Sequence, residues 1–185
     1  MIREIVLYGH PVLRQKGARV TETGEAIKQL AADMLDTMRE AHGVGLAAQQ
    51  VGVPLQLAVI DVTGVEDRPS TMAVDGQEVE LAKWMPLVLL NPMLELGKEK
   101  LAGPEGCLSF PEMTAEISRA LRVVARAQLL DGRHVQFEAT GLLGRALQHE
   151  FDHLQGILFI DRMSSAAKAS LAGKLKRLQR EAGLR

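Results

Sequence analysis

Apolar residues recur at the three- and four-residue spacing of amphipathic helices in three stretches of the chain. The first stretch covers residues 24–41. The second begins at Thr140, a candidate N-cap, and Gly156 is placed to end it. The third occupies residues 164–183, where two serines at the start can cap a helix. The pattern therefore predicts an N-terminal, a central and a C-terminal helix.

Shorter apolar runs between the first two helices are typical of β-strands. We expect strands at residues 55–62 and 86–90. A further pair, at residues 121–129 and 134–139, is joined by an Asp131-Gly132 turn, which is a strong signal for a hairpin. The middle of the chain should therefore form mostly antiparallel β-structure.

Two other segments have weaker patterns. Residues 64–85 contain a candidate hairpin at Asp75-Gly76 and are interpreted as a peripheral insertion, and residues 157–160 are interpreted as a short strand. We find no repeat or linker, and 185 residues with 46% hydrophobic content suit one core. The prediction is a single compact α+β domain over residues 1–185, with mostly antiparallel β-sheets around the central helix.

The charges are balanced, with 22 basic and 23 acidic side chains and a net charge of -1. No overall field favours nucleic acid or a membrane surface. The longest apolar runs are far shorter than the ~20 residues of a membrane-spanning helix. The single cysteine excludes an internal disulfide framework, and the N-terminus lacks the apolar core of a signal peptide. We expect a cytoplasmic protein with no DNA or membrane partner.

The central helix carries the motif His149-Glu150-Phe151-Asp152-His153. Two histidines four residues apart lie on one face of a helix, where their imidazoles can bind one metal ion. Glu150 is rotated around the axis and can accept a proton from water that the metal activates. The alternative is a solvated helix with an incidental motif, which chance produces in about one of a hundred chains of this length. The motif favours a metal hydrolase.

The third metal ligand is expected at Cys107. A lone cysteine is more often an inert core residue, but Cys107 stands among glycine and short polar residues in the segment PEGCLS. Two imidazoles and one thiolate leave a fourth position for water, which is typical of a catalytic metal site.

Three segments together resemble the signature motifs of the peptide deformylases. They are GVGLAAQQ at residues 43–50, EGCLS at 105–109 and QHEFDH at 148–153. They follow the family's order at comparable separations, and the resemblance extends over nearly the whole chain. It implies a hydrolase that removes the N-formyl group from the N-terminal formyl-methionine of nascent polypeptides and releases formate.

The resemblance implies a role for each matching residue. Glu150 is the general base and later the acid, and the side-chain amide of Gln50 and the backbone N–H of Leu108 stabilise the oxyanion. The backbone of Gly45 binds the substrate peptide. The metal ligands are Cys107, His149 and His153. One divalent ion is implied per chain. The family favours Fe²⁺, while the donor set by itself also suits Zn²⁺, Ni²⁺ or Co²⁺.

A pocket for the methionine side chain is implied at Val44, Leu142 and Ala146, although the last two would look the same as plain core residues. Arg145 departs from the family pattern, because relatives commonly have an apolar residue there. Thr114 stands where relatives often have arginine, so no substrate contact by that arginine is carried over.

Glu105 and Arg119 match a family ion pair that braces the cysteine loop, although either could be an ordinary surface charge. The C-terminal helix has many lysines and arginines, which usually form a solvated face. In some deformylases this helix docks on the ribosome, so a ribosome contact stays open here.

Two other functions compete with this interpretation. A zincin-type peptidase would take its third ligand from a later histidine or glutamate, but only Glu181 follows the motif. A catalytically inactive binding protein with the deformylase fold would be suspected if Glu150 or Cys107 were replaced, and both are present.

Overall fold

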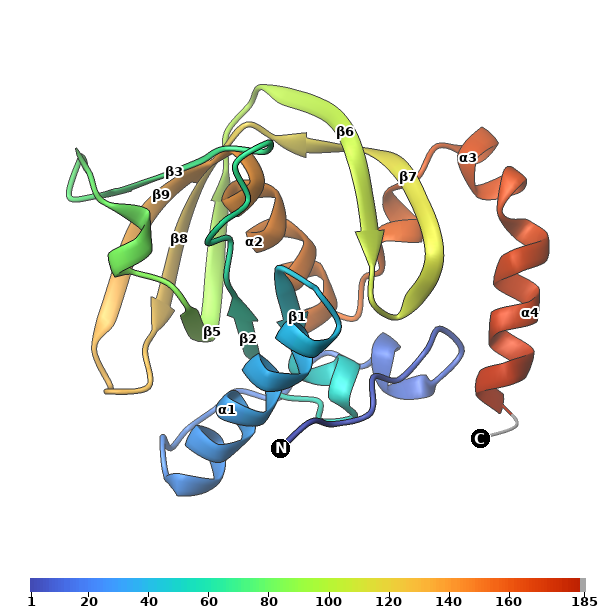
Figure 1. Ribbon diagram of the computed structural model, residues 1–185, viewed down its shortest axis with the longest axis horizontal. Helices are drawn as coiled ribbons and strands as arrows, with labels where there is room; N and C mark the ends of the chain where they lie inside the picture. Colours follow the sequence, from blue (N-terminus) through green and yellow to red (C-terminus); the bar gives the residue numbers. More distant parts are fainter. Residues whose placement is uncertain (184–185) are drawn as a thin grey trace.

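The computed structural model describes residues 1–183, and its main feature is a seven-stranded antiparallel sheet (Figure 1). The strand order is β1-β2-β5-β8-β9-β3-β4. The strands are β1 (Gly45–Ala47), β2 (Leu57–Ile60), β3 (Ser70–Val74), β4 (Gln77–Glu78), β5 (Leu87–Leu96), β8 (Arg122–Gln128) and β9 (His134–Thr140). The predicted hairpin around Asp131-Gly132 is confirmed as β8 and β9.

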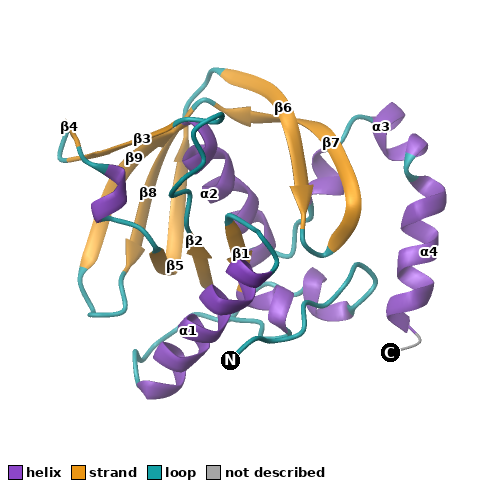
Figure 2. Ribbon diagram, viewed as in Figure 1, coloured by secondary structure: helices purple, strands orange, loops and turns teal. Residues whose placement is uncertain are grey.

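A second sheet consists of two long strands, β6 (Lys100–Cys107) and β7 (Phe110–Ala120), called here the β6–β7 hairpin. It stands apart from the large sheet (Figure 2). Leu108 and Ser109 form its turn, and the register shifts by a bulge between Gly106 and Cys107. The sequence patterns did not predict these two strands.

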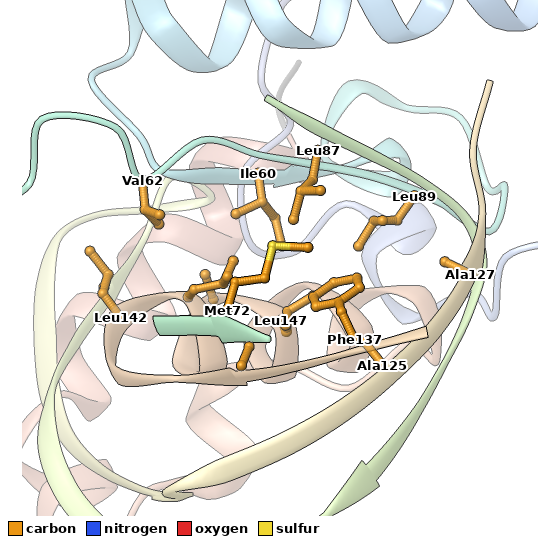
Figure 3. Packing of buried hydrophobic residues seen from close by; sticks show 13 residues of the cluster. Ile60, Val62, Met72, Leu87, Leu89, Ala125, Ala127, Phe137, Leu142 and Leu147 are labelled. Atoms are coloured by element: carbon orange, nitrogen blue, oxygen red, sulfur yellow. The ribbon is translucent and has the colours of Figure 1, made fainter. Parts of the chain in front are cut away.

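Helix α2 (Gly141–Leu154) lies between the two sheets and is the centre of the fold (Figure 1). One side buries Leu143 and Leu147 in a cluster with Met72 and Phe137 of the large sheet (Figure 3). All four side chains are at most 3% exposed. The predicted arrangement, an α+β domain with mostly antiparallel sheets around the HExxH helix, is confirmed.

The segment 64–85 is more than the peripheral insertion that we expected. Its first strand, β3, pairs with β9 inside the large sheet, and Met72 is fully buried. The start of α2 depends on the same segment: Leu142 N–H donates to the carbonyl of Pro69, and Leu143 N–H donates to the hydroxyl of Ser70. Thr140 is the N-cap residue, but its side chain makes no capping bond. Residues 69–70 therefore provide acceptors for two of the free N–H groups in the first turn of α2.

The remaining helices lie outside the sheets. Helix α1 (Glu25–Glu40) confirms the predicted N-terminal helix. The expected C-terminal helix is interrupted at Leu171, so it forms α3 (Ser165–Ser170) and α4 (Ala172–Gly183). Four 3-10 turns complete the described chain: η1 (Pro11–Arg14), η2 (Ala48–Val51), η3 (Leu81–Lys83) and η4 (Phe159–Arg162). Residues 157–160 were expected to be a strand but lead into η4 and pair with no strand. In the described part of the chain, no helix is long and apolar enough to cross a membrane.

Candidate metal centre

Two histidines of α2 lie one turn apart on the same side of the helix. The Nε2 atoms of His149 and His153 are 3.2 Å from each other. The two residues are 8% and 1% exposed, respectively. The expected geometry of the HExxH motif, with both imidazoles on one helical face, is therefore present.

Cys107, at the end of β6, brings its thiol to the same point. Its Sγ lies 3.4 Å from Nε2 of His153, and the ligand atoms of Cys107, His149 and His153 all lie within 4.8 Å of one another. Ligands bound at tetrahedral Zn²⁺ distances are about 3.3–3.7 Å apart. The separations of 3.2 and 3.4 Å are close to this range, and three protein ligands would leave a fourth tetrahedral position open. These three residues are the one group of possible metal ligands found among residues 1–183.

Glu105, two residues before Cys107, links the β6–β7 hairpin to α2. Its carboxylate accepts hydrogen bonds from Nδ1 of His149 at 2.6 Å and from Arg119 at 2.6 and 3.1 Å. Burial alone would raise the pKa of Glu105, but the bonds from His149 and Arg119 outweigh it and hold the pKa at about 2. An ionised Glu105 leaves Nε2 of His149 free to face a metal. The expected pairing of Glu105 with Arg119 is confirmed.

Asp152 extends this network and was missed in the sequence. It accepts hydrogen bonds from Arg119 at 2.7 Å and from Arg162 at 2.8 Å, and it is 5% exposed. A charged residue inside the motif, where the helix faces protein on several sides, is the signal that could have revealed it. Arg119 is thus held between two carboxylates, one from the hairpin and one from α2.

The electrostatics of the two histidines differ. Burial opposes a charge on His149, but hydrogen bonds with Cys107 and Glu105 hold its pKa well above the usual value. Burial and the neighbouring His149 lower the pKa of His153 well below the usual value. The pKa of His149 is therefore the higher of the two.

Glu150 is almost fully buried beside this site, at 5% exposure. Burial raises its pKa to about 7. Among the described residues, its Oε2 has no hydrogen-bond partner. A Cβ atom at Gly45 would come too close to Oε1 of Glu150, so a side chain there would displace the Glu150 carboxylate from its place beside the site.

Gln50, in η2, places its side-chain amide against the hairpin turn. Its Oε1 accepts from the Ala47 N–H at 2.9 Å, and its Nε2 lies 3.2 Å from the hydroxyl of Ser109 and 3.6 Å from Sγ of Cys107. The residue is 1% exposed. Ser109 is fully buried and was not singled out in the sequence. Its contact orients the amide toward the cysteine.

A cavity of about 470 Å³ opens beside these groups. It is bordered by nine of the ten residues that the sequence indicated for the site, namely Val44, Gly45, Gln50, Cys107, Leu108, Leu142, Ala146, His149 and Glu150. The tenth, His153, lies behind them at 1% exposure. The three motifs, far apart in the sequence, therefore meet at one cavity.

Arg145 and Thr114, the two departures from the family pattern, also border the cavity. The guanidinium of Arg145 is turned toward the β6–β7 hairpin, where it donates to the carbonyls of Leu101, Gly103 and Ile117. Its charge is therefore partnered by the hairpin backbone.

A family model described as polypeptide deformylase matches residues 2–169. The chain belongs to this family. It is 46% identical to the peptide deformylase of Methylacidiphilum infernorum (isolate V4) over 97% of this chain and 94% of that protein. It is 42% identical to the peptide deformylase of Opitutus terrae over 96% of this chain and 93% of that protein.

Solved deformylase structures have the same fold. The structure from Thermus thermophilus aligns with a TM-score of 0.82 at 37% identity, over 98% of this chain and 99% of that one. The structure from Thermotoga maritima aligns with a TM-score of 0.76 at 37% identity, over 89% of this chain and 99% of that one. A zincin-type third ligand finds no support, because Glu181, on α4, is not part of the group of possible metal ligands found among the described residues.

Proposed function

We propose that this deformylase-family chain is a metal-dependent hydrolase that removes the N-formyl group from N-terminal formyl-methionine and releases formate. The observation that carries the proposal is the convergence of the Cys107 thiol from β6 with both histidines of α2, beside the buried Glu150 and an open cavity. Membership of the polypeptide deformylase family supports it.

Cys107, His149 and His153 would hold the ion. When bound, a divalent metal lowers the pKa of a water molecule toward neutrality and polarises the formyl carbonyl. Glu150 would accept a proton from the attacking water as the water oxygen bonds to the formyl carbon. It would then deliver that proton to the leaving amine as the carbon–nitrogen bond breaks, which releases formate and the free N-terminus. A pKa of about 7 suits a carboxyl group that must accept and then return a proton near neutral pH.

Gln50 and Leu108 are proposed to stabilise the oxyanion of the tetrahedral intermediate. The Gln50 amide is held by Ala47 and Ser109, so its N–H is oriented before the substrate arrives. Leu108, in the hairpin turn, would donate its backbone N–H from the other side. Donors fixed in advance stabilise a developing charge without reorganisation during the reaction.

The methionine side chain is proposed to bind against Val44, Leu142 and Ala146. The last two lie one turn apart on α2 and are 7% and 6% exposed. The backbone of Gly45, in the edge strand β1, would bind the substrate peptide. The Arg145 guanidinium borders the same cavity and donates to the hairpin backbone.

For the metal, we propose Fe²⁺, with Zn²⁺, Ni²⁺ and Co²⁺ as ions that the same ligands accept. A thiolate with two imidazoles binds all four, and the order of affinity alone does not decide among them. An open ferrous site would also lose its metal by oxidation in air, which gives the proposal a measurable signature.

The proposed place of action is the cytoplasm, on nascent chains. The exposed face of α4 carries cations, including Lys174, Lys176 and Arg180, while Leu175 and Leu178 are buried. This face is a candidate contact with ribosomal RNA, whose phosphates attract lysine and arginine. The balanced charge of the whole chain gives no other reason to expect nucleic acid.

The test is an anaerobic assay of formyl-Met peptide hydrolysis by protein loaded with Fe²⁺, Ni²⁺ or Zn²⁺. We expect formate release by the Fe²⁺ form, and loss of that activity after exposure to air. No formate release from any form, although each chain binds one ion, would contradict the proposal.

Alkylation of the thiol tests the ligand role of Cys107 separately. Cys107 is the only cysteine of the chain, so the label reports on one site. We expect protection while metal is bound and reaction after chelation, because a coordinated thiolate is not free to react. Equal reactivity in both states would remove Cys107 from the ligand set.

A further inference from the structure

The metal ligands come from two elements that share no backbone hydrogen-bond ladder. His149 and His153 belong to α2, and Cys107 belongs to the β6–β7 hairpin, which is a sheet of its own. Apolar residues of the hairpin pack against Phe159 and Ile160, beyond α2. Side chains that cross from the helix to the hairpin also contribute to the distance between the thiol and the imidazoles.

Arg145 of α2 makes three hydrogen bonds to the hairpin backbone, whereas Gln148 of the same helix makes two, both to Ala120. Its guanidinium donates to the carbonyls of Leu101 at 3.0 Å, Gly103 at 3.1 Å and Ile117 at 2.7 Å. Gly103 and Ile117 are paired across the two strands. Arg145 thus holds both strands at once, one helical turn before His149.

Gly103 gives the guanidinium its place on the hairpin. A Cβ atom at this position would lie 3.4 Å from Cζ of Arg145 and 3.5 and 3.6 Å from its two terminal nitrogens. A methyl group would thus just touch the guanidinium, and a larger side chain would displace it. Because Gly103 has no side chain, β6 leaves room for the guanidinium of Arg145 from α2.

Arg145 also approaches the residue that holds His149. Its guanidinium lies 3.4 Å from Oε2 of Glu105, which is a longer contact than those from Arg119 and His149. The Arg145 side chain is 14% exposed, so little water replaces these bonds if they are lost. The planar guanidinium can serve several acceptors at once, which a lysine ammonium on a flexible stem cannot do equally well.

We infer that Arg145 is a positioning residue: its guanidinium holds the hairpin that carries Cys107 against the helix that carries both histidines, and so sets how tightly the site retains its metal. The inference rests on the metal site of the proposed function. It assigns Arg145 no contact with the substrate or the reacting atoms.

The test measures Co²⁺ affinity by competition with a chromophoric chelator, and follows the thiolate-to-cobalt absorption band of the loaded protein. Arg145→Met keeps the apolar stem and removes the guanidinium. We expect its dissociation constant for Co²⁺ to rise about tenfold, as for residues that orient metal ligands. Arg145→Lys should fall between the parent and the methionine variant, and Arg126→Met, on the exposed side of β8, should match the parent.

A double-mutant cycle with Gly103→Val connects the effect to the proposed contact. Gly103→Val alone should weaken Co²⁺ binding by displacing the guanidinium, and it should add little in the Arg145→Met background. If Arg145→Met does not fold, Arg145→Lys and Gly103→Val decide the question by the same measurement.

A purely structural role predicts a different result. The free energy of unfolding would then fall equally with and without metal, while Co²⁺ affinity and the absorption band stayed at parental values, and the inference would be wrong. Failure of the proposed function looks different again, because the parent itself would bind no Co²⁺ or release no formate.

Discussion

Helix α2 and the β6–β7 hairpin build the two halves of the candidate metal site in different ways. In α2 the relative position of His149 and His153 follows from the helix itself, because residues four apart lie on one face. In the hairpin no local rule places Cys107 near them. Its position depends on contacts between the two elements. Glu105 and Arg119 of the hairpin bond to His149 and Asp152 of α2. In the other direction, Arg145 of α2 bonds to the hairpin backbone.

Substitutions in the two elements should therefore have different effects. Changes on the cavity face of α2 should act on the chemistry or on substrate binding while the site stays assembled. Changes that loosen the hairpin should act first on the metal. Buried polar networks of this kind stabilise a single arrangement only when every member keeps its partner.

The largest effect is expected on the helix side, for Glu150→Gln. The glutamine cannot accept and return the proton, so turnover should fall by about 10⁴-fold, the upper end for acid–base catalysis. Co²⁺ binding should persist because the three ligands are unchanged. Turnover and metal content are measured on the same sample. Near-normal turnover would remove Glu150 from the mechanism. Loss of the metal would show that Glu150 also contributes to metal binding, so that proton transfer and metal binding are not separate on α2.

A smaller effect is expected for Gln50→Ala, on the hairpin side, where the amide contacts Ser109. Loss of one oxyanion donor should lower kcat by about 10²-fold, with KM much less affected. Steady-state kinetics on a formyl-Met peptide provide the measurement. A change confined to KM would make Gln50 a substrate-binding residue.

The same contrast decides how much of the structure could be predicted. The helix pattern indicated α2 and its motif, because eleven of its fourteen residues are buried and the apolar positions repeat regularly. The hairpin strands were missed because their sequence gives no such signal. Gly103, Pro104 and Gly106 interrupt β6, and a two-stranded sheet exposed on one side needs little alternation.

Long-range contacts account for the other differences. Nothing near Ser70 indicates that its hydroxyl serves the first turn of α2, and the pairing of β3 with β9 joins residues more than sixty positions apart. Arg145 could be recognised in the sequence as unusual, but its partners on the hairpin could not. The motifs indicated which residues meet at the site. The contacts that hold these residues together could be identified only in the folded structure.

Substrate preference should also depend on the α2 side of the cavity. A formyl-Met peptide should exceed a formyl-Gly peptide in kcat/KM by about 30-fold, from ~2 kcal/mol of side-chain burial, and formyl-norleucine should stay close to methionine. Leu142→Ala should reduce this discrimination, whereas Thr114→Ala, on the hairpin side of the same cavity, should leave it unchanged. Equal rates on all three peptides would contradict the pocket assignment.

The smallest effect is expected just beyond α2, at the ion pair between Asp161 and Arg14. Asp161 accepts hydrogen bonds from Arg14 at 2.5 and 3.2 Å and from the Leu158 N–H at 2.9 Å. Burial opposes the charge, but the bond from Arg14 lowers the pKa of Asp161 below its ordinary value of 3.8. A lowered folded-state pKa means that the stabilisation is fully present above pH 3.8 and is lost as the pH falls below it.

Because both side chains are partly exposed, Asp161→Asn should lower the free energy of unfolding by no more than about 1 kcal/mol at pH 7. Urea unfolding of parent and variant from pH 7 down to about pH 3 should show this difference shrinking at the acid end, with Co²⁺ affinity at pH 7 unchanged. A difference that stays constant with pH would exclude the charge as its cause, and weaker Co²⁺ binding would show that the region after α2, and not the hairpin alone, positions the metal ligands.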